Sequence, residues 1–211
     1  MIGAQVCGEA CVDVEWLLTD SRSLCFPEST LFFAIRTDRG DGHRYVRDLY
    51  ERGVRAFVVN SVQDGLAGAV QLLVQDTLTA LQRLAERHRE SYAIPVIGIT
   101  GSNGKTVIKE WLYQMLSPDM AVTRSPRSYN SQIGVPLSVW GLNSNSQIGI
   151  FEAGISRPGE MEALQRIIQP TIGVFTGLGP AHQENFQSME QKRQEKMLLF
   201  KDCPVGFEAG D

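Results

Sequence analysis

The chain has 211 residues, a net charge of −4 and a hydrophobic fraction of 43%. This length allows one large or two small packed domains, and the acidic balance argues against a nucleic-acid partner, because phosphate backbones call for a basic excess. No apolar run approaches the ~20 residues of a membrane span, and the N-terminus lacks a signal-peptide pattern, so we expect a cytoplasmic protein without membrane insertion.

Residues 1–92 have the pattern of a small α/β domain. Short apolar or alternating runs predict strands, and apolar residues at helical spacing predict helices. The glycine-punctuated stretch at residues 38–43 is expected to be a loop. The expected strands are residues 12–16, 31–35, 56–59 and 72–74. The expected helices are residues 45–52 and 77–89.

A second strand–helix series follows, and we place the domain boundary near Tyr92, because the residue before Pro95 is biased away from helix. The expected strands are residues 96–100, 120–123, 147–152 and 171–176. The expected helices are residues 105–116, 133–142, 159–168 and 189–200. Strands that alternate with helices predict a mostly parallel, doubly wound sheet over residues 93–211. The tail, residues 202–211, shows no pattern.

Residues 98–106 read GITGSNGKT and connect an expected strand to an expected helix. Such a turn presents backbone N–H groups and the positive end of the helix dipole to an anion. Ile99 replaces the first glycine of the usual motif, yet the context favours a polyphosphate loop over an ordinary glycine turn. Lys105 would then meet the terminal phosphates, and Thr106 would ligate Mg²⁺. The residues expected to bind the phosphates are Gly101, Ser102, Asn103, Gly104, Lys105 and Thr106.

Other polar residues also follow expected strands of this series, where ligands bind in doubly wound sheets. Glu152 ends an apolar strand and can ligate Mg²⁺, although a capping or surface glutamate has the same pattern. Taken alone, His182 has the pattern of a structural or solvated loop histidine, and Lys196 that of a solvated lysine on a helix. Residues 130–132 could equally be a polar loop.

Taken together, these motifs resemble the Mur ligases of peptidoglycan synthesis, and most of all the MurF type, which adds D-alanyl-D-alanine to UDP-N-acetylmuramoyl-tripeptide. The resemblance covers nearly the whole chain, in the family's order. The segments that carry it are residues 20–22, 31–34, 41–43, 100–106, 108–110, 129–136, 152–154 and 158–161. Two side chains depart from the common family pattern, Val107 after the phosphate loop and Gln132 where many relatives are acidic.

The resemblance implies ATP and Mg²⁺ as cofactors and assigns roles to single residues. The implied Mg²⁺ ligands are Thr106, Glu152, His182 and Lys196, the last as a carbamate formed with CO₂. Lys192 is the alternative to Lys196 if the register shifts. The implied precursor contacts are Ser21 and Arg22 for the UDP group, and Asn130 and Ser131 near the substrate. The implied catalytic residues are Lys105 and Lys196.

The implied organisation is a UDP-precursor-binding domain, residues 1–92, and the first part of an ATP-binding central domain, residues 93–211. Because the family has three domains, we expect a fragment that is inactive alone, from a parent that could be a fusion with alanine racemase. Two alternatives stay open: a non-catalytic UDP-sugar or nucleotide-binding module, and another superfamily ligase such as a folylpolyglutamate synthetase. Joint retention of Lys105, Glu152 and Lys196 argues against the first, and residues 21–22 and 41–43 argue against the second.

Overall fold

The computed structural model describes residues 2–9, 11–37, 40–179 and 185–208. The chain folds into two compact units, Met1–Leu84 and Ala85–Asp211. The division lies inside helix α2 (Thr77–Glu90), a few residues before the boundary that we expected near Tyr92. It lies there because Ala85, in the second half of α2, is fully buried in the core of the second unit.

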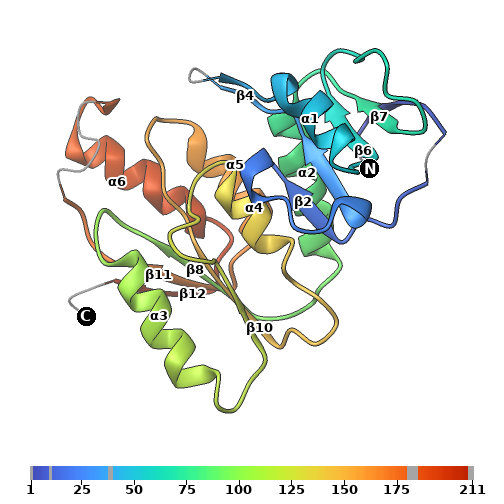
Figure 1. Ribbon diagram of the computed structural model, residues 1–211. Helices are drawn as coiled ribbons and strands as arrows, with labels where there is room; N and C mark the ends of the chain where they lie inside the picture. Colours follow the sequence, from blue (N-terminus) through green and yellow to red (C-terminus); the bar gives the residue numbers. More distant parts are fainter. Residues whose placement is uncertain (1, 10, 38–39, 180–184, 209–211) are drawn as a thin grey trace. The chain divides into compact units, whose positions relative to one another are not determined.

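The first unit contains a five-stranded sheet with the order β1-β7-β6-β3-β2 (Figure 1). Its strands are β1 (Gln5–Cys7), β2 (Trp16–Leu18), β3 (Thr30–Phe33), β6 (Ala56–Val59) and β7 (Val70–Leu73). All pairings are parallel except that of β1 with β7. Helix α1 (Val46–Glu51) packs Val46 and Leu49 against Phe32 and Phe57 of the sheet. A small hairpin, β4 (Arg36–Thr37) with β5 (Gly40–Asp41), leads into a 3-10 helix (Gly42–Tyr45).

The strand expected at residues 12–16 was wrong, because regular pairing begins only at its last residue. Trp16 pairs with Thr30, the first residue of β3, and the strand runs on to Leu18. Residues 12–15 do alternate between half-buried and exposed side chains. That alternation alone does not make a strand, since a strand also needs a partner backbone.

The second unit contains a five-stranded, fully parallel sheet with the order β12-β11-β8-β10-β9, which confirms the expected parallel architecture. Its strands are β8 (Val96–Thr100), β9 (Val122–Arg124), β10 (Ile148–Glu152), β11 (Ile172–Phe175) and β12 (Val205–Glu208). Its helices are α3 (Lys105–Leu116), α4 (Gly134–Val139), α5 (Glu160–Ile168) and α6 (Met189–Met197), the last followed by a 3-10 turn, η5 (Leu198–Phe200).

Two apolar clusters cover the two faces of this sheet, with α3 on one face and α4 and α5 on the other (Figure 1). Alternate residues of β8 point to opposite faces, as a strand requires. Ile97 and Ile99 pack with α3, whereas Val96 packs in the cluster of α4 and α5. Gly98 has no room for a side chain, because a Cβ atom there would lie 2.8 Å from Pro170.

The tail contradicts the expectation of an unpatterned segment, because Val205–Glu208 forms β12 along β11. All four residues of β12 are exposed, so no burial pattern announces this strand. The helix expected at residues 133–142 is shorter, spanning Gly134–Val139, and Pro136 lies in its first turn as expected. Among the described residues, no helix is long and apolar enough to cross a membrane.

Candidate functional site

The phosphate loop connects β8 to α3 through two glycines with left-handed or related backbone angles. Gly101 has φ +145° and Gly104 has φ +80°, conformations that other residues adopt only with strain. Gly104 is the N-cap of α3 and has no side chain with which to cap it. The first N–H groups of α3 therefore face the loop without a side-chain acceptor from the N-cap, which is the arrangement that binds anions.

The segment after β11 holds the phosphate loop from one side. Thr176 donates its hydroxyl to the carbonyl of Asn103, and the Ser102 N–H donates to the Gly177 carbonyl over 2.9 Å. The Ser102 hydroxyl donates to the Gly179 carbonyl over 3.2 Å. A Cβ atom on Gly101 would lie 2.0 Å from the Thr176 hydroxyl oxygen, so only glycine fits at this contact.

Three lysines converge on these loops. Lys105 donates to the Gly101 carbonyl over 2.9 Å, and Lys196 of α6 donates to the same oxygen over 3.2 Å. Lys192, one turn earlier on α6, donates to the Gly179 carbonyl over 2.6 Å. Burial, together with the nearby ammonium groups of Lys105 and Lys192, lowers the pKa of Lys196 to about 8. Burial likewise lowers the pKa of Lys105.

Glu152 is the last residue of β10, next to β8 in the sheet, and its side chain is fully buried. Its Oε2 accepts hydrogen bonds from the Thr106 hydroxyl over 3.1 Å and from the Asn130 amide over 3.4 Å. Thr106 also contacts the hydroxyl of Ser128, at 3.2 Å. The structure therefore brings together Glu152, Thr106 and Asn130, three of the residues that the sequence singled out.

The segment at residues 130–132 is anchored in several directions. The Asn130 carbonyl accepts the Gly154 N–H over 2.7 Å, which ties the segment to the residues after β10. The Ser131 hydroxyl accepts the Gly134 N–H over 3.1 Å at the start of α4. Gln132 donates to the Glu160 carbonyl over 3.0 Å. These hydrogen bonds hold the segment against the residues after β10, α4 and α5.

One buried charge beside Glu152 was not assigned a role from the sequence. Lys109, on α3, is fully buried, and its ammonium lies 3.0 Å from Glu152 Oε1. The sequence does carry a weak signal, since Lys109 is three residues after Thr106 and therefore lies on the same helix face. The sequence could not identify Glu152 as its partner, because the two residues are far apart in the chain and only the fold brings β10 next to α3.

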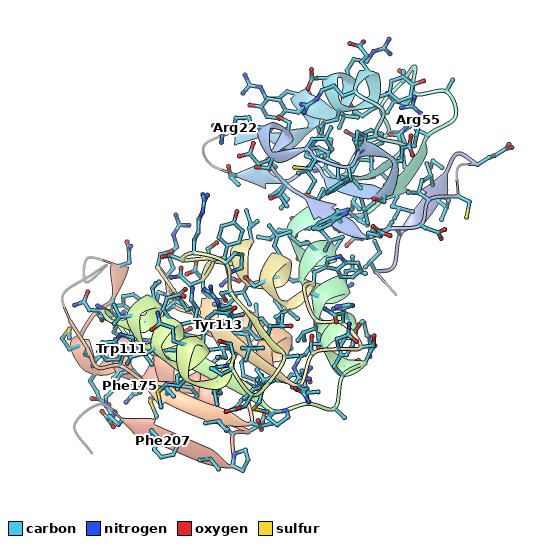
Figure 2. All side chains as sticks on the ribbon, turned by 60° about the horizontal axis from the view of Figure 1, so that its bottom comes forward. Arg22, Arg55, Trp111, Tyr113, Phe175 and Phe207 are labelled. Carbon is cyan, nitrogen blue, oxygen red and sulfur yellow. The ribbon has the colours of Figure 1, made fainter. Side chains whose placement is uncertain are left out.

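Three other residues were predicted to belong to the site. Ser21 and Arg22 belong to the first unit, in a 3-10 turn after β2. Ser21 is buried and its carbonyl accepts a hydrogen bond from Arg52. The Arg22 guanidinium (labelled in Figure 2) is 88% exposed and makes a bidentate pair with Asp20. His182 lies outside the described residues.

Comparison with known proteins fits this geometry. The family model of the Mur ligase middle domain matches residues 99–207, from the phosphate loop to β12. The chain is 35% identical over 187 residues to the UDP-N-acetylmuramoyl-tripeptide–D-alanyl-D-alanine ligase of Bacillus subtilis, covering 88% of this chain and 40% of that protein. The corresponding ligase of Synechocystis is 38% identical over 167 residues, covering 79% and 36%.

Solved structures agree. MurF from Acinetobacter baumannii superposes with a TM-score of 0.84 at 30% identity, covering 91% of this chain and 42% of that one. MurF ligase from Thermotoga maritima in complex with ADP gives 0.80 at 27% identity, covering 93% and 46%. The chain spans about 40% of the length of these relatives. It belongs to the Mur ligase family, its second unit carries the Mur ligase middle domain, and the relatives named above are ligases of the MurF type.

Proposed function

We propose that this chain binds ATP and the UDP-linked precursor for an ATP-dependent amide ligase that joins D-alanyl-D-alanine to UDP-N-acetylmuramoyl-tripeptide. One observation carries the proposal: the Glu152 carboxylate lies 3.1 Å from the Thr106 hydroxyl, at the start of a phosphate-loop helix. This pair places oxygen donors for a divalent cation beside a loop for polyphosphate. The names of the curated relatives support the choice of substrates.

In the proposed reaction, a carboxylate oxygen of the tripeptide attacks the γ-phosphorus of ATP, ADP leaves, and an acyl phosphate forms. The amine of D-alanyl-D-alanine then attacks the acyl carbon, phosphate leaves, and the nitrogen loses a proton. Phosphoryl transfer depends on positioning and charge neutralisation more than on covalent chemistry by the protein. We assign that work to the ammonium of Lys105 and to the loop formed by Gly101, Ser102, Asn103, Gly104 and Thr106.

The donors at the loop fit Mg²⁺. Thr106 and Glu152 offer hard oxygen ligands side by side, as this cation prefers. A carboxylate has about four lone-pair sites. In the part of the chain that the structure describes, Glu152 Oε2 accepts hydrogen bonds from Thr106 and Asn130, and Oε1 accepts none but forms an ion pair with the ammonium of Lys109. Bound Mg²⁺ would neutralise charge on the phosphoryl oxygens. We propose Thr106, Glu152 and His182 as its ligands.

We propose that Lys196 is carbamylated by CO₂, which would replace a cation at the loop by an anion that helps to hold metal. Carbamate formation requires a neutral amine, and Lys196 has a pKa of about 8 because it is buried beside two other ammonium groups. A solvated lysine with a pKa near 10.4 would hold far less neutral amine at pH 7. The same surroundings favour loss of the positive charge by carbamylation, since it removes like-charge repulsion.

We assign precursor binding to both units. Ser21 and Arg22 are proposed to contact the UDP group, because a guanidinium binds phosphate through bidentate hydrogen bonds. Asn130 and Ser131 are proposed to lie near the reacting carboxylate, since Asn130 already contacts Glu152. Use of ATP and a nucleotide-linked precursor places the proposed activity in the cytoplasm.

Isothermal titration calorimetry of this chain tests the nucleotide half of the proposal. ADP is titrated in Mg²⁺ and again in EDTA, and Mg²⁺ should tighten binding to the wild type. Thr106→Val removes the proposed metal-ligating hydroxyl and should reduce that Mg²⁺ effect about tenfold. Thr79→Val, an equivalent change at an exposed position of α2, should leave it unchanged. Equal affinity in Mg²⁺ and EDTA would contradict the proposed metal site.

A second titration tests the substrate class. UDP-N-acetylmuramoyl-tripeptide should bind, whereas folate should not. Binding of folate without binding of the UDP-linked precursor would overturn the assignment in favour of another ligase of the superfamily. Binding of the precursor with no binding of ADP under any condition would instead favour a UDP-sugar-binding module.

A further inference from the structure

Lys109 contacts three separate parts of the second unit while fully buried. Its ammonium lies 3.0 Å from Glu152 Oε1 at the end of β10 and 3.2 Å from Glu110 Oε1 on its own helix. It also donates a hydrogen bond to the Arg127 carbonyl, in the segment after β9. An ammonium held by two ion pairs and one hydrogen bond in this way is fixed in place, so it does not swing toward a bound phosphate.

The two oxygens of Glu152 consequently have different surroundings. Oε1 faces Lys109, whereas Oε2 accepts from Thr106 and Asn130 at the phosphate loop. The terminal torsion of a glutamate side chain is broad and poorly restrained by its own rotamer preferences. Partners on both oxygens therefore determine the plane of the carboxylate and direct Oε2 toward the Thr106 hydroxyl.

Lys109 is itself held by a chain of alternating charges that leads from α3 to the end of β9. Glu110 pairs with Lys109 on one side and with Arg124, at the end of β9, on the other. The Arg124 guanidinium lies 4.0 Å from the ring centroid of Tyr113, which is labelled in Figure 2. Burying ion pairs costs desolvation and yields little net stability, so stability alone does not account for a fully buried lysine at this point.

We propose that Lys109 is a positioning residue for the metal site: it holds Oε1 of Glu152 and thereby presents Oε2, beside the Thr106 hydroxyl, to Mg²⁺. The inference rests on the proposed function, because it concerns the same metal site. It assigns to Lys109 no contact with nucleotide or substrate. Partners that orient metal ligands commonly change metal affinity 10- to 100-fold when removed.

The test compares the Mg²⁺ effect on ADP binding in the wild type and in Lys109→Met, by calorimetry in Mg²⁺ and in EDTA. The Mg²⁺ effect is the ratio of the ADP affinity in Mg²⁺ to that in EDTA, and it should be about tenfold smaller in Lys109→Met. The affinity of Lys109→Met for ADP in EDTA should stay within about threefold of wild type. Arg89→Met is the matched control. Arg89 is also a buried cation, but it binds the carbonyls of Tyr92, Ile168 and Gln169 and not Glu152. Arg89→Met should lower the melting temperature and leave the Mg²⁺ effect unchanged.

Removal of a buried cation could prevent folding, so Lys109→Gln is made in parallel. Glutamine keeps an N–H donor for the Arg127 carbonyl but no charge, and it should show the same loss of the Mg²⁺ effect. A wild-type Mg²⁺ effect in a folded Lys109→Met or Lys109→Gln protein would overturn the positioning role. Absence of any Mg²⁺ effect in the wild type would instead contradict the proposed function, so the two failures are distinguishable.

Discussion

Lys105 and Lys196 donate hydrogen bonds to the same carbonyl oxygen, that of Gly101, over 2.9 and 3.2 Å. Two ammonium groups on one acceptor repel each other, and Lys196 is buried whereas Lys105 is partly buried. The pKa of Lys196 accordingly falls to about 8, with burial as the largest cause. The phosphate loop therefore stores unfavourable charge that a bound polyphosphate or a carbamate would relieve.

The first prediction concerns the pH dependence of stability that Lys196 causes. In the unfolded chain its pKa is about 10.4, so between pH 8 and 10.4 the unfolded state binds more protons than the folded state. The contribution of Lys196 to the free energy of unfolding should therefore rise over that range. We therefore compare the free energy of unfolding of Lys196→Met with that of the wild type. The difference should favour the variant more at pH 7 than at pH 10.5, by on the order of 1 kcal/mol.

Urea unfolding in CO₂-free buffer at the two pH values measures this difference. Lys201→Met removes an exposed lysine just after η5 and serves as the control, with no change between the two pH values expected. A Lys196→Met difference that is equal at pH 7 and pH 10.5 would show that the Lys196 ammonium is not strained in the folded chain.

The second prediction concerns carbamylation itself. Wild-type protein equilibrated with ¹³C-labelled bicarbonate should give a carbamate signal in its ¹³C NMR spectrum, and the signal should grow from pH 7 to pH 9 as Lys196 loses its proton. Lys196→Met should lack the signal, and Lys201→Met should retain it. A signal that survives in Lys196→Met and disappears in Lys192→Met would move the modification to the neighbouring lysine.

The third prediction concerns the fit of the phosphate loop against the segment after β11. Gly101→Ala would place a Cβ atom 2.0 Å from the Thr176 hydroxyl oxygen, at a backbone φ of +145°. The strain should cost roughly 1–3 kcal/mol of stability and displace the loop. ADP affinity and melting temperature should both fall. Gly206→Ala is the matched control, because a Cβ atom on Gly206 meets nothing within 4 Å, and wild-type ADP binding in Gly101→Ala would refute this account.

Local sequence patterns predicted the parts of this fold that depend on neighbouring residues. The glycine turn into α3 and the end of β10 at Glu152 both follow from short-range periodicity, and the structure confirms those positions. Strand β12 could not be predicted in this way, because it forms through backbone pairing of Val205 with Ile172 and its side chains are all exposed. The pairing of Lys109 with Glu152 was hidden for a similar reason, since it joins residues far apart in the sequence.

The domain boundary shows the same limit. Pro95 correctly marked the end of helical structure before β8. It could not show that the second half of α2 belongs to the core of the second unit, where Ala85 is buried. A helix has one periodicity along its length, and its pattern does not reveal which neighbour each half packs against.

The fourth prediction concerns Asp41 in the first unit. Its carboxylate accepts the N–H of His43 over 3.0 Å, contacts the His43 ring at 2.6 Å and accepts from Arg36 over 2.9 Å. These partners, with the His43 N–H first, hold the pKa of Asp41 well below its usual range. A depressed carboxylate pKa stabilises the fold above pH ~4, and that contribution is lost as the pH falls.

Asp41→Asn should therefore reduce stability at pH 7, by on the order of 1 kcal/mol, since the carboxylate is partly exposed. The difference from the wild type should shrink as the pH is lowered below 4. Asp48→Asn breaks an exposed pair with Arg52 on α1 and should change stability by less than about 0.5 kcal/mol at either pH. Melting curves of the wild type, Asp41→Asn and Asp48→Asn at pH 7 and pH 3 measure these differences. An effect of Asp41→Asn that is the same at both pH values would contradict the assignment.

The last prediction separates binding from stability at Arg22. The Arg22 side chain is 88% exposed and pairs only with nearby Asp20 among the ion pairs of the described residues, so its loss should leave the melting temperature unchanged. If Arg22 contacts the diphosphate, Arg22→Ala should weaken binding of UDP-N-acetylmuramoyl-tripeptide about tenfold, because it removes charge-assisted hydrogen bonds to phosphate oxygens. Arg47→Ala removes another exposed arginine, which is 62% exposed and pairs with Glu51 on α1, and it should not affect binding. Calorimetric titration of the three proteins decides the point: equal affinity in Arg22→Ala and Arg47→Ala would remove Arg22 from the precursor site, whereas a selective loss would assign the turn after β2 to recognition of the diphosphate.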